Sequence, residues 1–237
     1  MRGFSVGGCS LVVAFGLLVG CGDDSGTGGG GGASPSGITD ADIEPVIESY
    51  AVNVHTNYEE AIAQAKVLKT AVDAFVDAPS EATHDAAKQA WLDARPVYLQ
   101  SEVYRFYNGP IDNEETGVEG QLNGWPLDES YIDYTVDAPT AGIINDPVGF
   151  PEITKQVIAE ANEAVDEKSL SAGYHAVEFL LWGQDLNEQP TDAGLRSFTD
   201  YTTAPNADRR GDYLKAVTEK IIDDLELVEE QWEPTEG

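Results

Sequence analysis

A histidine and a glutamate stand three residues apart in a segment that is otherwise almost entirely apolar. The segment reads AGYHAVEFLLWGQDL, residues 172–186, and the two polar residues are His175 and Glu178. Apolar residues on every side of a helix are the pattern of a buried helix, and residues i and i+3 lie on one helix face. We therefore expect both side chains to project from one face into the interior of the protein.

Three kinds of chemistry account for such a pair. His175 and Glu178 can simply hydrogen-bond each other or a nearby arginine, as buried polar groups must. An imidazole nitrogen and a carboxylate from adjacent turns can also bind one metal ion, or the pair can act in acid–base catalysis. The spacing alone favours the first, purely structural interpretation.

A third candidate ligand, an acid on another predicted helix, supports the metal interpretation. The apolar stripe of that helix is Ala87, Trp91, Ala94 and Tyr98. The same stripe then turns polar at Ser101, Glu102 and Arg105, and charges that face a core are costly unless they pair or bind something. Glu102, His175 and Glu178 would form a nitrogen and oxygen ligand set that suits iron or zinc and leaves coordination positions open. Ser101 or Arg105 would orient these ligands.

Helices account for most of the remaining chain. Apolar residues recur at steps of three and four from Ile43 to Phe75, which predicts one long helix that ends near Pro79. A second helix begins between residues 80 and 83, and Pro96 should kink it. Further helices are predicted over residues 151–167 and after Asn206. The other two histidines, His55 and His84, are expected on polar helix faces.

Glycine and proline interrupt residues 108–150, which predicts a long irregular region inside the domain. No strand pattern of useful length is present. The fold class is therefore all-α, an antiparallel helical bundle.

The stretch GYHAVEFLLWGQDL, residues 173–186, resembles the Gly-x-His-x-x-Glu motif of the imelysin family, especially its iron-regulated protein A branch. Residues 94–112 resemble the family's first-domain segment, and residues 206–226 resemble the helix that follows the motif. The resemblance implies two bundle-like halves with a metal site between them. His175 and Glu178 match the motif, and the polar group in the first domain is matched by Ser101, Glu102, Arg105 and Asp112.

The resemblance also implies a role. Members are typically bacterial envelope proteins, often iron-regulated, and some are classed as metallopeptidases. We expect binding of iron, or alternatively zinc, as a cation or a chelate, in iron uptake with envelope partners. The rivals are a metallopeptidase and a helical interaction module with a structural polar core. Family members continue beyond the length of this chain, so we expect residues 38–237 to lack part of a second bundle.

The first residues resemble a lipoprotein leader. Residues 1–20 hold a basic residue and an apolar run too short to span a bilayer. The run ends in Leu18-Val19-Gly20-Cys21, which resembles a lipobox, so Cys21 is the expected lipidation site. Residues 21–37 are rich in glycine and serine and predict a flexible linker. Gly22 after the cysteine favours the outer membrane, facing the periplasm or the cell surface.

The cysteine count and the charge exclude several functions. Cys9 is the one other cysteine and lies inside the expected leader, so the mature chain would have no disulfide and no cysteine-ligated metal. The formal net charge is −30, which repels nucleic acid and concentrates cations near the surface.

Overall fold

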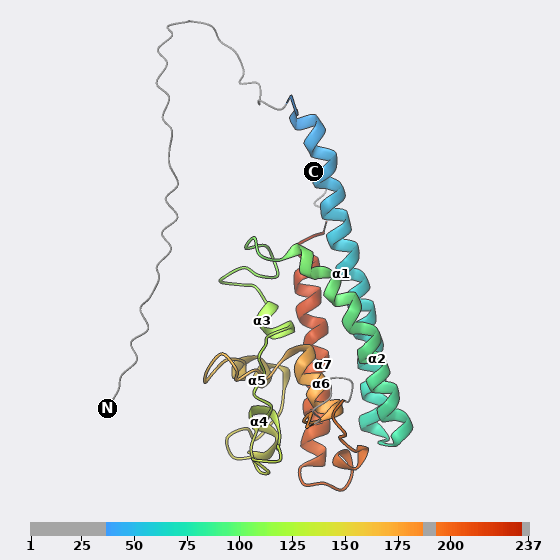
Figure 1. Ribbon diagram of the computed structural model, residues 1–237, viewed down its shortest axis with the longest axis vertical. Coiled ribbons are helices and arrows are strands. Elements are labelled where there is room, and N and C mark those ends of the chain that lie inside the picture. Colours follow the sequence, from blue (N-terminus) through green and yellow to red (C-terminus); the bar gives the residue numbers. More distant parts are fainter. Residues whose placement is uncertain (1–36, 187–192, 234–237) are drawn as a thin grey trace, which may run out of the picture. The chain divides into compact units, whose positions relative to one another are not determined.

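The structure, a computed structural model, describes residues 37–186 and 193–233. The chain divides into two compact units, residues 1–40 and 41–237, and nearly all described residues belong to the second. Cys21, the leader and most of the linker lie outside the described residues. Helices and short turns make up the second unit, without a strand among the residues described (Figure 1).

Four helices carry most of the unit. They are α1 (Asp40–Asp77), α2 (Glu81–Leu99), α6 (Gly173–Trp182) and α7 (Ala207–Glu230). The shorter elements are η1 (Gln100–Tyr104), α3 (Glu119–Leu122), α4 (Glu129–Ile132), η2 (Ile143–Asn145), α5 (Lys155–Ala161) and η3 (Phe198–Tyr201). The all-α class predicted from the sequence is confirmed.

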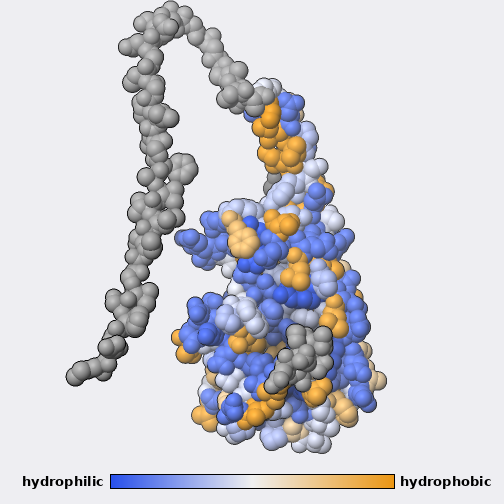
Figure 2. Space-filling model, viewed as in Figure 1, coloured by the Kyte–Doolittle hydropathy of each residue, from blue (hydrophilic) through white to orange (hydrophobic). Residues whose placement is uncertain are grey.

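Helices α1 and α2 form an antiparallel hairpin, as the sequence predicts (Figure 1). The buried residues of α1 follow the predicted stripe from Val54 to Phe75. Ser80 caps α2 in a reciprocal capping box with Thr83, which satisfies two backbone N–H groups at the helix start. The first turns of α1 differ from the prediction, since their apolar side chains are exposed (Figure 2).

Helix α7 runs antiparallel to α1, and ion pairs fix the direction. His55 and Lys66 of α1 pair with Glu229 and Glu226 of α7, at 2.6 and 2.7 Å. Asp77, at the end of α1, pairs with a lysine near the start of α7. Helix α6 packs against both α7 and α2, so it lies in the centre of the bundle.

The irregular region, residues 108–150, contains less helix than the segments on either side of it, but it still contributes to the core. Among its buried residues are Ile111, Leu122, Ile132, Ile143 and Ile144. The helix predicted over residues 151–167 is limited to α5, seven residues long. Asn206 occupies the N-cap position of α7, but its side chain makes no capping bond and instead donates to Oδ1 of Asn145 at 2.9 Å.

A buried carboxylate joins the irregular region to the last helix. Asp133 accepts hydrogen bonds from Arg196 at 2.6 Å and from Arg210 at 2.7 and 3.0 Å. Burial alone would raise the pKa of Asp133, but these two guanidinium groups outweigh it and hold that pKa below its usual value.

Among the residues that the structure describes, every helix is either too short or too polar to cross a bilayer.

Candidate functional site

His175 and Glu178 share one face of α6, as the i, i+3 spacing predicts, and the Nδ1 of His175 lies 3.0 Å from Oε2 of Glu178. The expectation that both lie in the interior is wrong. Their side chains keep 21% and 44% of their surface exposed, while the helix around them is buried. Helix α6 therefore turns this one polar face outward and buries its other sides.

An arginine from α2 completes the contacts of the imidazole. The Nη2 atom of Arg95 lies 3.3 Å from Nε2 of His175, and the same atom donates to Oδ1 of Asn123. Arginine can only donate, so Nε2 accepts and Nδ1 carries the hydrogen that is donated to Glu178. The contacts thus select one tautomer of neutral His175.

The guanidinium of Arg95 is itself held in place by aromatic rings. It lies 5.4 Å from the ring centroids of both Tyr98 and Tyr174, a favourable distance for cation–π contact. Burial lowers the pKa of Arg95, and the charges of Glu178 and Glu102 act in the opposite direction. The charge of Arg95 therefore interacts with Glu102 and Glu178, the two carboxylates that were predicted to bind a metal.

The polar face of α6 opens into a pocket of about 430 Å³. The pocket carboxylates are Glu129, Glu178 and Asp185, which come from α4, from α6 and from the segment after α6. Burial, with help from neighbouring acids, raises the pKa of Glu129 above its ordinary value, although Arg196 opposes this. Phe179 and three tryptophans, Trp91, Trp125 and Trp182, also line the pocket. The ring centroid of Trp125 lies 4.9 Å from that of His175.

Gly173 sets the position of the polar pair. It begins α6 with φ of +87°, and a Cβ atom built on it would lie 2.6 Å from the carbonyl oxygen of Leu122 and 2.7 Å from that of Gln121. Real side chains avoid both the positive φ and such a contact. The glycine therefore lets α6 start directly against α3, next to the Asn123 that holds Arg95.

The structure does not bring Glu102 to the pair. Glu102 lies in η1 with 48% of its side chain exposed, and it pairs with Arg105 at 2.8 Å. Within residues 37–186 and 193–233, one trio of histidine and acid side chains has its ligand atoms within 4.8 Å of one another, and it is His55, Glu59 and Glu229. Metal binding by Glu102, His175 and Glu178 stays a prediction, but their ligand atoms do not converge in this arrangement.

The residues expected to orient the ligands lie around η1. Arg105 joins Glu102 to Glu119, which lies 2.9 Å from it. Ser101 is buried. Asp112 accepts hydrogen bonds from the backbone N–H groups of Phe106 and Gly109, so its carboxylate stabilises the turn after η1.

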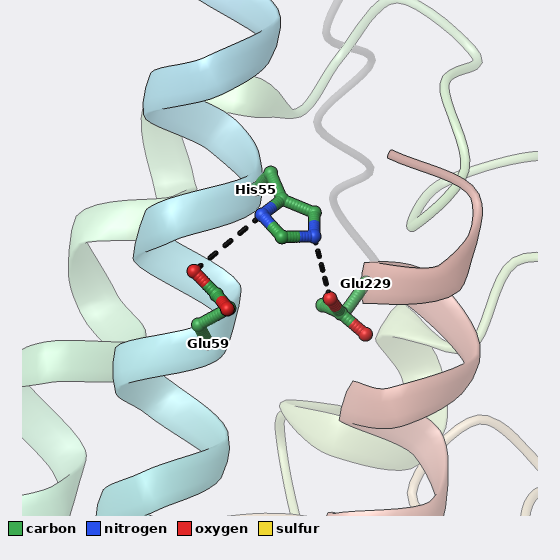
Figure 3. Close-up of side chains that lie close together, drawn as sticks. All are labelled: His55, Glu59 and Glu229. Carbon is green, nitrogen blue, oxygen red and sulfur yellow. Dashed lines mark ion pairs between the residues drawn. The ribbon is translucent and has the colours of Figure 1, made fainter. Parts of the chain in front are cut away.

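The expectation that both other histidines lie on polar helix faces is wrong for His84. His84 is buried, stacks on Phe75 at 4.5 Å between ring centroids, and bonds the carbonyl oxygen of Leu181 at 2.8 Å. His55 lies between the carboxylates of Glu59 and Glu229 (Figure 3).

Sequence reasoning missed Arg95, Trp125 and Glu129. Arg95 immediately precedes Pro96, and Trp125 and Glu129 lie in the irregular region. A periodicity argument could have flagged Arg95, since it follows the buried Trp91 by four residues. Nothing local indicates that the irregular region returns to α6.

Comparison with known proteins identifies relatives of this chain. Iron-regulated protein A of Synechococcus elongatus is 30% identical over 152 residues, which are 64% of this chain and 38% of that protein. The crystal structure of an iron-regulated protein A precursor from Parabacteroides distasonis shares the fold, with a TM-score of 0.50 and 24% identity over 73% of this chain and 40% of that one. The chain thus spans about two fifths of the length of these relatives. The family model described as Imelysin matches residues 54–237, most of the sequence, and the chain therefore belongs to the imelysin family.

Proposed function

We propose that the chain binds a metal cation, iron in preference to zinc, in the pocket beside His175, and that it serves iron uptake at the bacterial cell envelope. One observation carries the proposal: an imidazole and carboxylates from three separate segments line the same pocket. Iron accepts this mixture of nitrogen and oxygen ligands. The name of the relative, Iron-regulated protein A, supports the choice of iron, and the net charge of −30 favours the approach of cations.

The proposed ligands are His175 through Nε2, with Glu129 and Asp185 from the pocket wall. In the described residues these three do not form a group with ligand atoms within 4.8 Å of one another, so binding requires the side chains to move towards the ion. Glu178 then keeps the Nδ1–H of His175 and fixes the direction of the ring, as carboxylates commonly do for metal-bound histidines. Glu102 stays outside this set because it is half-exposed and paired with Arg105.

Arg95 competes with the metal in this proposal, since its guanidinium donates to Nε2 of His175. The histidine can give that lone pair to a cation only when Arg95 releases it. The positive charge of Arg95 also repels a cation at close range.

Isothermal titration of the full chain with ferrous iron, under exclusion of oxygen, tests the site. We expect His175→Gln to weaken binding about tenfold or more, because a ligand is lost and removal of even an outer partner costs about tenfold. Glu48→Gln, which removes one exposed acid of α1, is the matched control and should leave binding unchanged. Equal affinity of the wild type and His175→Gln would refute the proposal.

Arg95→Gln should have the opposite effect. Removal of the positive charge beside Nε2 is expected to strengthen iron binding on the order of tenfold, or ~1.4 kcal/mol. Weaker binding by a variant that still folds, as judged by circular dichroism, would mean that Arg95 supports the ligand instead of opposing it.

The proposal includes attachment of the protein to a membrane through a lipid. A lipid on Cys21 and the linker of residues 21–37 would keep the domain close to a membrane surface, where envelope partners for iron uptake could reach it. Export and lipid attachment are testable by fractionation of cells that express the chain with Cys21 or with Cys21→Ser. We expect the membrane fraction to lose the Cys21→Ser protein.

A metallopeptidase is the second candidate, and Glu129 favours it. A carboxylate with a raised pKa beside a pocket can act as a general base or acid. Incubation of the metal-loaded chain with denatured casein distinguishes the two functions. In this candidate Glu129 acts as the base and not as a ligand. Cleavage that is lost in Glu129→Gln while metal binding is retained would support the peptidase, whereas metal binding without cleavage favours uptake.

A further inference from the structure

A second group of metal-ligating side chains lies far along the bundle from the α6 pocket. His55 and Glu59 stand on adjacent turns of α1, and Glu229 comes from the last turns of α7 (Figure 3). The Nε2 of His55 lies 2.6 Å from Glu229, and its Nδ1 lies 3.5 Å from Glu59. One ligand atom from each residue lies within 4.8 Å of the others.

The contact with Glu59 is too long for a normal hydrogen bond. Its side chain is 58% exposed, whereas those of His55 and Glu229 are 18% and 19% exposed. The imidazole therefore holds Glu229 firmly and Glu59 only loosely. A carboxylate that faces a histidine without being bonded by it remains available to a third group.

The surroundings are strongly acidic. A groove of about 520 Å³ lies between α1 and α7 beside this trio. Its charged lining is Glu59, Lys66, Glu226, Glu229, Glu230 and Glu233. Lys66 pairs with Glu226 at 2.7 Å, so the charge of the one lysine in the lining is already compensated.

We propose that His55, Glu59 and Glu229 form a divalent transition-metal site that joins α1 to α7. Ligand atoms bound to one ion at about 2.0–2.2 Å lie roughly 3.3–4.4 Å apart. Glu59 and Glu229 now lie at different nitrogens of His55, so an ion on one nitrogen requires the carboxylate at the other nitrogen to turn towards it. One imidazole and two carboxylates suit Zn²⁺ and similar ions and leave a position for water. The site shares no residue with the pocket at His175 and does not depend on its proposed function.

Titration of the metal-free full chain with Co²⁺ tests the site, because this ion fits zinc sites and its visible absorption reports the ligands. We expect the spectrum of the wild type to contain a component that is lost in His55→Gln and weakened about tenfold or more in Glu229→Gln. His175→Gln is the control for the other site and should retain this component. The two variants thus separate failure of this proposal from failure of the function proposed at α6.

A stability measurement gives a second readout. If the ion bridges the two helices, saturating Zn²⁺ should raise the melting temperature of the wild type more than that of His55→Gln. An equal rise in both proteins, or a Co²⁺ spectrum that does not change in His55→Gln, would overturn the proposal. In either case the trio would be an ion pair that links α1 to α7 without metal.

Discussion

His84 gives the protein a dependence on pH at the scale of a single side chain. Burial, with the charge of Lys88, lowers the pKa of His84 from 6.5 to about 4. The unfolded chain therefore binds more protons than the native state between these values. The contribution of neutral His84 to the free energy of unfolding is complete above about pH 6.5. It is lost as the pH falls towards 4, by roughly 3 kcal/mol in total.

His84→Gln isolates this effect, because glutamine can still donate to the carbonyl of Leu181 but does not titrate. In urea unfolding, the free energy of unfolding of the wild type relative to His84→Gln should fall by about 2 kcal/mol between pH 7 and pH 5. If the difference stays constant over this range, the imidazole is not buried in its neutral form.

At the scale of elements, the Asp133 carboxylate fixes the irregular region to α7. It is enclosed by Arg196 and Arg210, and all three side chains are almost fully buried. Asp133→Asn removes the charge that compensates two guanidinium groups, so we expect a loss of about 3–5 kcal/mol in the free energy of unfolding. Asp137→Asn changes an exposed acid four residues away and should shift the midpoint in urea by very little. Similar midpoints for both variants would show that the buried pairs contribute little.

At the scale of the whole molecule, the charge of −30 opposes compact folding through mutual repulsion. Salt screens this repulsion, with a Debye length of about 30 Å at 0.01 M and about 10 Å at 0.1 M. We expect the melting temperature to rise by several degrees between these NaCl concentrations. KCl should reproduce the rise, since screening does not depend on the identity of the cation. A rise with only one of the two salts would indicate a specific ion site.

Local signals in the sequence predicted the long helices well. The stripe of α1 from Val54 onward and the start of α2 after Ser80 depend on residues a few positions apart, and both are confirmed. The contact between His175 and Glu178 is local too, and the structure contains it.

The predictions that were wrong concern residues where the helix type changes along the chain, or residues whose neighbours are distant in the sequence. Pro96 cannot donate to the helix ladder, and α2 passes into the 3₁₀ turn η1 after Leu99. A 3₁₀ turn has about 3.0 residues per turn instead of about 3.6, so Glu102 rotates off the predicted stripe. His84 is buried by Phe75 and Leu181, and no local pattern specifies these neighbours. Arg95 and Glu129 reach α6 through tertiary packing alone.

The backbone of Gly173 has a consequence for how the His-x-x-Glu pair should be recognised in other sequences. Any larger residue there would push the start of α6 away from the turn that carries Asn123, and the imidazole would leave the reach of Arg95. A search that required only the histidine and the acid would therefore collect chains in which the two are paired but point elsewhere. The glycine at position 173 is therefore the part of the motif that indicates where His175 and Glu178 lie relative to Arg95.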